Sequence, residues 1–161
     1  MGRFQEAAVL TERAIEANGD DYNTYIPYGN ALERLARKQE AERLRSRMTG
    51  VLRQQLELVP EDVRARILLA SNLAFSREEE ESVRQLQTAV ALRPNDGNIL
   101  YNAACTYGVL ARKLKALETL KKIFAAGYGL RDWAAKDSDL DCLHDDPEFR
   151  KLVGLSESPA S

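Results

Sequence analysis

Two cysteines and one histidine are the side chains of this sequence best suited to nucleophilic or metal chemistry. Cys142 and His144 lie two positions apart, and Cys105 lies far upstream of both. A thiol nucleophile needs a base and an orienting group held together in a cleft, whereas residues two apart in a loop usually point in different directions. The same small inventory argues against a disulfide scaffold and a zinc site. We therefore expect no catalytic residue, no metal and no cofactor, and we expect both cysteines to be buried apolar side chains.

An acidic segment near the C-terminus imitates the spacing of a calcium-binding loop. Its carboxylates stand at positions 1, 3, 5, 9 and 12 of such a loop, namely Asp137, Asp139, Asp141, Asp145 and Glu148. Cys142, however, replaces the glycine that makes the sharp turn, and Pro147 stiffens the end. The alternative is a pair of helix caps, in which Asp137 or Ser138 ends one turn and Asp146 with Pro147 begins the last helix. We expect the caps rather than a calcium site.

The charges of the chain are nearly balanced. There are 23 Lys and Arg residues against 25 Asp and Glu residues, a net charge of −2. Such a balance argues against a generic nucleic-acid or anionic-membrane binder. A basic stretch does run from Arg34 to Arg53, offset only by Glu40 and Glu42, but no aromatic residues interleave with it for base stacking. We expect this stretch to be a solvated helix face, with no nucleic-acid partner.

Length and composition predict one ordinary domain. At 161 residues, 44% hydrophobic and 30% charged, the chain is too apolar for disorder and too polar for a membrane protein. No apolar run approaches the roughly 18 residues that span a bilayer, and the sequence does not open on a signal-peptide pattern. We therefore expect a cytoplasmic protein without a membrane partner. A Gly-rich phosphate loop and a nucleophile motif are also missing, so an enzyme is not expected.

Apolar residues recur at gaps of 3 and 4, which is the spacing of amphipathic helices. Ser76 with Glu79 has the form of a capping box, and Asp96 has the position of a helix cap. Sustained alternation of β-branched residues is missing from the sequence, so we expect an all-α fold. The expected helices cover residues 3–18, 22–36, 38–58, 62–75, 78–93, 97–110, 113–126, 131–136 and 147–153.

The sequence repeats with a period of 34 residues. Pro60 and Pro94 are one period apart, as are Leu86 and Leu120. Between the earlier and the later part of the chain the offset is 41, so one unit carries an insertion of 7 residues. Seven residues are almost two helical turns, so the insertion, which falls in the helix 38–58, leaves the same face pointing inward.

This unit resembles the tetratricopeptide repeat, whose pattern of an aromatic, Leu-Gly or Leu-Ala, Tyr, Ala, Phe, Ala and Pro it partly keeps. In the unit 63–96 the matching residues are Leu69, Ala70, Leu73, Ser82, Leu86, Ala89 and Pro94, and Arg66 replaces the first aromatic. The resemblance implies a right-handed α-solenoid of helix-turn-helix repeats with a short helical C-terminal cap. Its expected parts are a repeat region 1–126, with a half repeat at 2–21 and repeats at 22–62, 63–96 and 97–126, a capping segment at 127–154 and a disordered tail at 155–161.

In the tetratricopeptide family, the first helix of each unit lines a concave groove. By that resemblance the expected groove residues are Asn23, Asn30, Arg34, Arg64, Ile67, Ser71, Tyr101 and Asn102. Asparagine amides can donate to and accept from a peptide backbone, and tyrosine adds an apolar face with a polar tip. The resemblance thus implies a non-catalytic scaffold that binds a peptide or protein segment. The lysine-rich clamp of relatives that bind chaperone tails is missing, so such tails are not the expected ligand.

A second resemblance covers the C-terminal part of the chain. The segments 101–105, 132–133 and 139–149 are similar to the closing segment of certain bacterial tetratricopeptide proteins. In those proteins the segment ends repeat arrays that lie behind protein kinase, nucleotidyl cyclase or transcription-regulator domains. The alternative function implied is a regulatory signalling module of a larger bacterial protein, whose catalytic or DNA-binding part lies upstream.

The sequence opens on what resembles the second helix of a repeat, without the first helix of that repeat. Phe4, Ala7, Ala8 and Ala14 would then face a partner outside the half repeat. Burial of a large aromatic side chain stabilises a fold by roughly 1.5–3 kcal/mol, and an exposed side chain does not contribute this free energy. We expect this face to be covered by upstream helices of a longer protein or by a second copy of the chain, so a homodimer is one of two expected arrangements.

Overall fold

The structure is a computed structural model that describes residues 2–18 and 21–155. All regular elements in these two ranges are helices, as the apolar spacing predicts. In chain order they are α1 (Gly2–Ala17), η1 (Tyr22–Thr24), α2 (Tyr25–Arg34), α3 (Lys38–Leu58), α4 (Val63–Phe75), α5 (Glu79–Leu92), α6 (Gly97–Val109), α7 (Lys113–Ala125), α8 (Arg131–Ala134), η2 (Ser138–Leu143) and α9 (Pro147–Leu152), where η1 and η2 are 3₁₀ helices.

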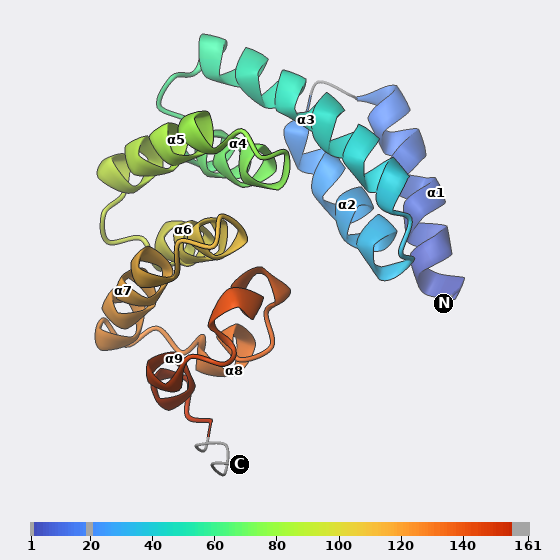
Figure 1. Ribbon diagram of the computed structural model, residues 1–161. Coiled ribbons are helices and arrows are strands. Elements are labelled where there is room, and N and C mark those ends of the chain that lie inside the picture. Colours follow the sequence, from blue (N-terminus) through green and yellow to red (C-terminus); the bar gives the residue numbers. More distant parts are fainter. Residues whose placement is uncertain (1, 19–20, 156–161) are drawn as a thin grey trace.

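The helices pair as hairpins, and the hairpins stack into an arc (Figure 1). The helix α2 packs on α3, α4 on α5 and α6 on α7, while α4 also contacts α3 and α6. In Figure 1, α2, α4 and α6 lie toward the inner side of the arc, and the C-terminal segment curls in below α6. The chain is therefore an α-solenoid of helix-turn-helix repeats, and the expected fold class is confirmed.

Two clusters of buried side chains form the core, and α4 belongs to both. Leu69 and Leu73, each at most 1% exposed, join the cluster made with α1, α2 and α3. Ile67 and Ala70, on the same helix, join the cluster that continues as far as Phe149 in α9. Because one helix serves both clusters, the solenoid is continuous through this point.

Small residues let the two helices of a hairpin touch. Ser82 of α5 is fully buried, and its hydroxyl donates to the carbonyl oxygen of Ala70 in α4 at 2.7 Å. Ala116 of α7, one period later, is also fully buried. In the first complete hairpin, a Cβ added to Gly29 of α2 would meet Leu44 of α3 at 3.8 Å. The small positions of the repeat are thus the points of closest helix contact.

The same turn closes each hairpin. Its left-handed residues are Ala36 (φ 55°), Arg77 (φ 64°) and Ala111 (φ 54°), and they are separated by the two offsets of the sequence, 41 and 34 residues. The N–H of the following residue donates to a carbonyl oxygen of the first helix at 2.8–2.9 Å, in the pairs Arg37 to Leu32, Glu78 to Leu73 and Arg112 to Tyr107. This is the Schellman arrangement that commonly ends a helix.

The capping box expected at Ser76 is wrong. Ser76 follows the end of α4, and its N–H donates to carbonyl oxygens of that helix. A capping box would need Arg77 and Glu78 to be the first residues of the helix. Arg77 is instead the left-handed residue of the turn, and α5 begins only at Glu79. The Glu79 carboxylate instead accepts a hydrogen bond from Nε of Arg112 at 2.8 Å. The cap expected at Asp96 is confirmed, since its carboxylate accepts the N–H of Asn98 at 2.9 Å.

Asp62 connects three elements at the junction between the first two complete hairpins. Its Oδ1 caps α4 by accepting the N–H of Ala65 at 2.9 Å. Its Oδ2 accepts Nε2 of Gln55, in α3, at 2.9 Å and the hydroxyl of Tyr22, in η1, at 3.2 Å. Burial alone would raise the pKa of Asp62, but these hydrogen bonds outweigh it and hold the pKa below its ordinary value.

We expect Asp62→Ala to lower the free energy of unfolding by about 1–3 kcal/mol at pH 7, because it removes a helix cap and leaves Gln55 and Tyr22 without an acceptor. A carboxyl group whose pKa is lower in the folded chain stabilises that state above the unfolded pKa, and this contribution disappears as the pH falls through the folded value. The gap between wild type and variant should therefore narrow below about pH 4. Urea unfolding at neutral and acidic pH measures this difference in unfolding free energy, and Asp145→Ala is the control because its carboxylate is exposed. A difference that does not change with pH would contradict the lowered pKa of Asp62.

The left-handed turns generate a second prediction. An alanine pays a steric penalty at φ 54° that glycine does not. We expect Ala111→Gly to raise the free energy of unfolding by about 1 kcal/mol, and Ala91→Gly, on the exposed surface of α5, to lower it by a similar amount. Thermal unfolding should show that the melting temperature rises for Ala111→Gly and falls for Ala91→Gly. A shift of the same sign in both variants would show that Ala111 is not strained at its positive φ.

Candidate binding groove

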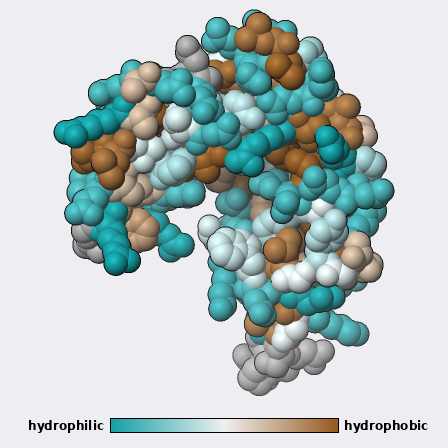
Figure 2. All heavy atoms as spheres, turned by 180° about the vertical axis from the view of Figure 1, so that it is seen from behind, coloured by the Kyte–Doolittle hydropathy of each residue, from teal (hydrophilic) through white to brown (hydrophobic). Residues whose placement is uncertain are grey.

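A cavity of about 820 Å³ opens on the concave side of the arc, between α2 and the segment that follows α7. Figure 2 shows the molecule hollowed between its N-terminal helices and its C-terminal end. The lining residues on α2 are Asn30 and Arg34, and those on the other wall are Gly129, Leu130, Asp132, Trp133, Lys136, Asp137, Ser138 and Asp139. The two walls come from parts of the chain that are about a hundred residues apart.

The α2 wall is the polar face of an amphipathic helix. Asn30 and Arg34 are four residues apart, so they lie on the same face, and both are exposed. On the opposite face, Tyr25 and Leu32 are at most 1% exposed. Burial of that apolar face fixes the rotation of α2 and presents an amide and a guanidinium to the cavity.

The opposite wall carries the one tryptophan of the sequence. Trp133 lies in α8 and has 67% of its surface exposed, whereas the next residue, Ala134, is fully buried. The neighbouring Arg131 stacks over the ring of Phe124 at 4.7 Å and donates from Nε to the carbonyl oxygen of Leu152 at 3.2 Å. Tryptophan is highly buried on average and is enriched at binding hot spots. An exposed indole on a firmly held turn is therefore a candidate contact surface.

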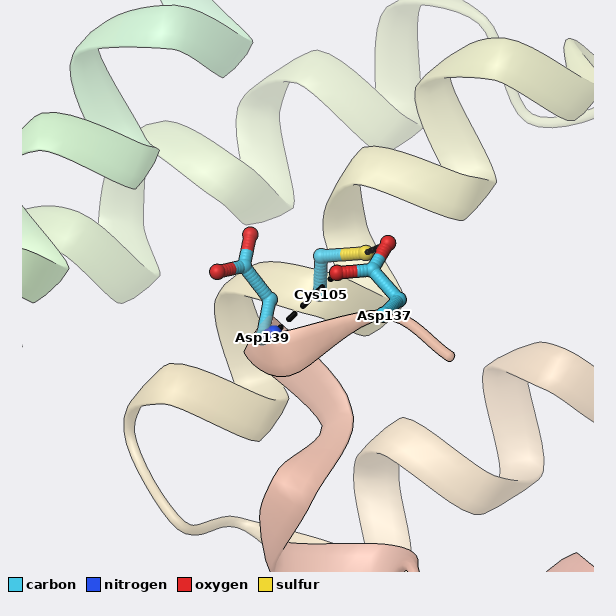
Figure 3. A group of neighbouring side chains, drawn as sticks. All are labelled: Cys105, Asp137 and Asp139. Atoms are coloured by element: carbon cyan, nitrogen blue, oxygen red, sulfur yellow. Dashed lines mark hydrogen bonds between the residues drawn. The ribbon is translucent and has the colours of Figure 1, made fainter. Parts of the chain in front are cut away.

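A polar junction between α6 and η2 positions this wall. The hydroxyl of Tyr101 donates to Oδ2 of Asp137 at 2.8 Å, and the thiol of Cys105 donates to the same oxygen at 3.6 Å. The N–H of Asp139 donates to Oδ1 of Asp137 at 3.1 Å (Figure 3). At Gly108 a Cβ would overlap the carbonyl oxygen of Asp139. Glycine thus permits the close approach, and the hydrogen bonds fix it.

The junction keeps its donors protonated. Burial raises the pKa of Tyr101 well above its ordinary value, and the nearby Cys105 and Asp137 raise it further. Burial likewise raises the pKa of the Cys105 thiol, with Asp137 and Asp139 adding to the effect. A thiol that resists ionisation is a poor nucleophile and a poor metal ligand. Tyr101 and Cys105 therefore act here as hydrogen-bond donors to one carboxylate.

Cys105, Asp137 and Asp139 also bring three potential metal-ligand atoms within 4.8 Å of one another. Both carboxylate oxygens of Asp137 already accept hydrogen bonds, as described above. The acidic residues of the calcium-like spacing have separate tasks. The N–H of Asp137 ends the turn after α8 by donating to the carbonyl oxygen of Ala134 at 3.4 Å, and its carboxylate caps η2. Asp146 caps α9 with Pro147 at its start, and Glu148 pairs with Lys121 at 2.5 Å. Two of the acidic residues in this segment, Asp137 and Asp146, are therefore helix caps.

His144 contacts side chains other than Cys142. Nδ1 of His144 lies 3.3 Å from a carboxylate oxygen of Asp141, and its ring stacks on Phe149 at 5.8 Å between centroids. Cys142 is half-buried, and burial raises the pKa of its thiol. Both cysteines are unpaired thiols, and Cys105 is the more deeply buried.

The structure distributes the eight expected groove residues over several places. Asn30 and Arg34 line the cavity, and Tyr101 lies behind its wall through Asp137. Nε of Arg64 donates to Oδ1 of Asn23 at 3.0 Å, so these two residues meet where η1 faces α4.

The remaining three expected residues differ in their access to solvent. Asn102 is exposed, and its amide donates to the carbonyl oxygen of Asn98 at 2.8 Å. Ser71 is half-buried on α4. Ile67 is a correction, because it is only 3% exposed and belongs to the core cluster that α4 shares with α6. Packing of α4 against α6 turns this side chain inward, so it has no surface to offer a ligand.

Trp133, Lys136 and the rest of the C-terminal wall were not among the expected groove residues. Their place depends on the return of the C-terminal segment toward α2, which no local spacing predicts. The available signal was the unusual pairing of a single tryptophan with many acidic residues in a short segment.

Within residues 2–18 and 21–155, no helix is long and apolar enough to cross a membrane.

Comparisons with known proteins bear on the fold and the family. No family model matches the sequence. A curated protein of Mus musculus, interferon-induced protein with tetratricopeptide repeats 3, is 30% identical over 121 residues. The match covers 75% of this chain and 29% of the mouse protein, so the chain spans less than a third of that relative.

Two solved structures illustrate the structural likeness. The crystal structure of MamA aligns with a TM-score of 0.53 at 17% identity, over 95% of this chain and 84% of MamA. YrrB, described as a TPR protein with an unusual peptide-binding site, aligns over 80% of each chain at 19% identity, and its TM-score of 0.45 is too low to support an argument. The likeness to MamA agrees with the α-solenoid fold, and the sequence match to the mouse protein supports a tetratricopeptide-repeat family for this chain.

Proposed function

We propose that this chain is a non-catalytic interaction scaffold that binds an extended peptide segment in its concave groove. The observation that carries the proposal is Trp133, an indole with 67% of its surface exposed beside a cavity of about 820 Å³. Arg34 and Asn30 face it from the other wall. An apolar anchor opposed by a few polar groups is the usual composition of a recognition site.

The chemistry of the two walls defines the ligand. The amide of Asn30 can both donate to and accept from a peptide backbone. Arg34 offers a forked donor to a carboxylate, while Asp132 and Asp139 give the other wall negative charge next to Lys136. The ligand that fits is a short extended peptide with an apolar side chain for Trp133 and charged residues of both signs beside it.

Further groove contacts come from the remaining expected residues. Asn23 and Arg64, joined by their hydrogen bond, Ser71 and Asn102 extend the surface along the inner helices. Tyr101 acts through the junction that holds Asp137 rather than through direct contact. Ile67 is left out of the site because it is buried.

A second function is supported by the C-terminal resemblance. The closing segment 139–149 is firmly packed, with Leu140, Leu143 and Phe149 fully buried. A segment that completes the repeat array so tightly suits a regulatory module of a larger signalling protein. Reading the coding sequence upstream of Met1 decides this alternative. A cytoplasmic location, a bacterial origin and the lack of a nucleic-acid partner stay predictions from the sequence.

We expect Trp133→Ala to weaken peptide binding by about tenfold or more, because the anchor is lost while little buried surface changes. The probe is a peptide selected against the chain from a display library and titrated by calorimetry. The matched control is Leu114→Ala, which removes a side chain that is 78% exposed and does not line the cavity. Unchanged affinity of the selected peptide for Trp133→Ala would refute the groove as its site.

We expect Gly108→Ala to lower the affinity for the same selected peptide. It should also lower the free energy of unfolding by about 1–3 kcal/mol. The added methyl group overlaps the carbonyl oxygen of Asp139, so η2 must move and the wall that carries Trp133 must move with it. Urea unfolding and calorimetry measure the two effects. A variant with full stability and full affinity would show that the close approach at Gly108 does not position the groove.

A further inference from the structure

The outer face of α1 is apolar and exposed. We define this face by Ala7, Leu10, Ala14 and Ala17, whose spacing of 3, 4 and 3 places them on one side of the helix. Leu10 has 66% of its surface exposed, and Ala14 and Ala17 are also exposed, whereas Ala7, at the edge of the face, is half-buried and packs against the core. The helix meets the core through a different side, where Ala8 and Ile15 are at most 3% exposed, so the expectation that Ala8 faces an outside partner is wrong. In Figure 2, where α1 runs along the left edge, hydrophobic side chains gather at that edge.

The equivalent face of α3, one period later, is covered. Ala41, Leu44 and Met48 correspond to Ala7, Leu10 and Ala14, and their exposures are 4%, 9% and 6%. Leu44 packs against Gly29 of α2, the first helix of its own hairpin.

A second equivalent confirms what this face does in a solenoid. In α5 the residue that corresponds to Ala7 is Ser82, which is fully buried and donates to Ala70 of α4. In α3 and α5 this face therefore holds a neighbouring helix in direct contact. The outer face of α1 keeps the alanine and the leucine of α3 at positions 7 and 10, and it is exposed at Leu10 and Ala14, so it is suited to contact a helix.

Charged residues beside the outer face indicate which helix fits. Glu6 and Arg13 are both exposed and seven residues apart, so at about 100° per residue they flank the outer face on the same side. When two copies of such a helix lie antiparallel, the same flanks of the two copies meet. A two-fold axis close to Leu10 then places Glu6 of each copy next to Arg13 of the other copy. The alanines at positions 7 and 14 exchange places across the same axis and allow the two helices to approach closely.

We propose that two copies of this chain pair through α1, antiparallel, with Leu10 of both copies packed together near the two-fold axis. Glu6 of one copy forms an ion pair with Arg13 of the partner subunit, and the reciprocal pair forms at the other end. This inference does not rest on the groove, because no α1 residue lines the cavity. The dimer leaves both grooves open and so presents two of them in one assembly.

A contact of one helix from each subunit is small for a protein interface, so we expect a dimer that dissociates on dilution. Sedimentation velocity of the full chain, from about 1 to 300 µM, is the primary measurement. The wild type should shift from monomer to dimer in this range, and Leu10→Glu should remain monomeric. Leu114→Glu, which changes a leucine that is 78% exposed on α7, is the control and should dimerise as the wild type does.

Charge reversal tests the antiparallel register itself. Glu6→Arg and Arg13→Glu should each raise the dimer dissociation constant about tenfold, because each sets like charges against one another. An equimolar mixture of these two variants should recover the wild-type affinity, since every facing pair is then again of opposite sign. Each single substitution also serves as the folding control for the mixture.

Three results would overturn the proposal. One is a wild type that stays monomeric at the highest concentration, which would leave the face to a helix of another chain or of a longer protein. Another is a dimer that Leu10→Glu does not weaken, which would place self-association elsewhere, such as in the groove. The third is a mixture of the charge variants that associates no better than either alone, which would exclude the antiparallel register.

Discussion

Each hairpin of this solenoid can bury its apolar faces only against its neighbours, and the rest of the structure depends on this constraint. The constraint is met where side chains are small. Ser82 and Ala116, both without exposed surface, let the second helix of a hairpin rest on the first. The helix α4 then connects two core clusters, with Leu69 and Leu73 on one side and Ala70 on the other. The hairpins of the arc therefore stabilise one another, and the same contacts that stabilise the chain also set its shape.

The same constraint shapes the C-terminal end. After α7, the residues up to 155 form no further hairpin of long helices, and the chain covers α6 with η2, where Leu140 and Leu143 are fully buried. Gly108 allows the backbones to approach, and the hydrogen bonds from Tyr101 and Cys105 to Asp137 hold them. A closing segment that protects the last hairpin thereby becomes a wall of the groove. Two of its acidic residues, Asp137 and Asp146, serve as helix caps.

The N-terminal end meets the constraint differently. Leu10 stands where Leu44 is buried one period later, yet most of its surface is open. Interior faces of a repeat array are therefore recognisable even when they lie at its edge, because their residue types are those of the covered faces. The helices α6 and α1 thus show two outcomes of one physical requirement: the first is covered by η2, and the second leaves Leu10 exposed to solvent.

Much of the fold could be predicted from the sequence, because its determinants are local. Helix spacing, the 34-residue period with its insertion, and the caps at Asp96 and Asp146 all depend on residues within a few turns of one another. Local reasoning was wrong at Ser76, because a capping box and a Schellman turn compete for the same residues there. The left-handed residue of the turn is Arg77 and not a glycine, so the sequence did not indicate the turn.

The sequence by itself thus determined an all-α array of repeats and the faces by which its helices pack. Only the tertiary structure decided which side chains line the cavity. Ile67 shares the helical spacing of exposed groove positions, but the approach of α6 buries it. Trp133 and Arg34 lie about a hundred residues apart, and they face one cavity because the arc curves and the closing segment returns toward α2. Curvature is the sum of many small helix–helix angles, and no spacing within a single unit encodes that sum.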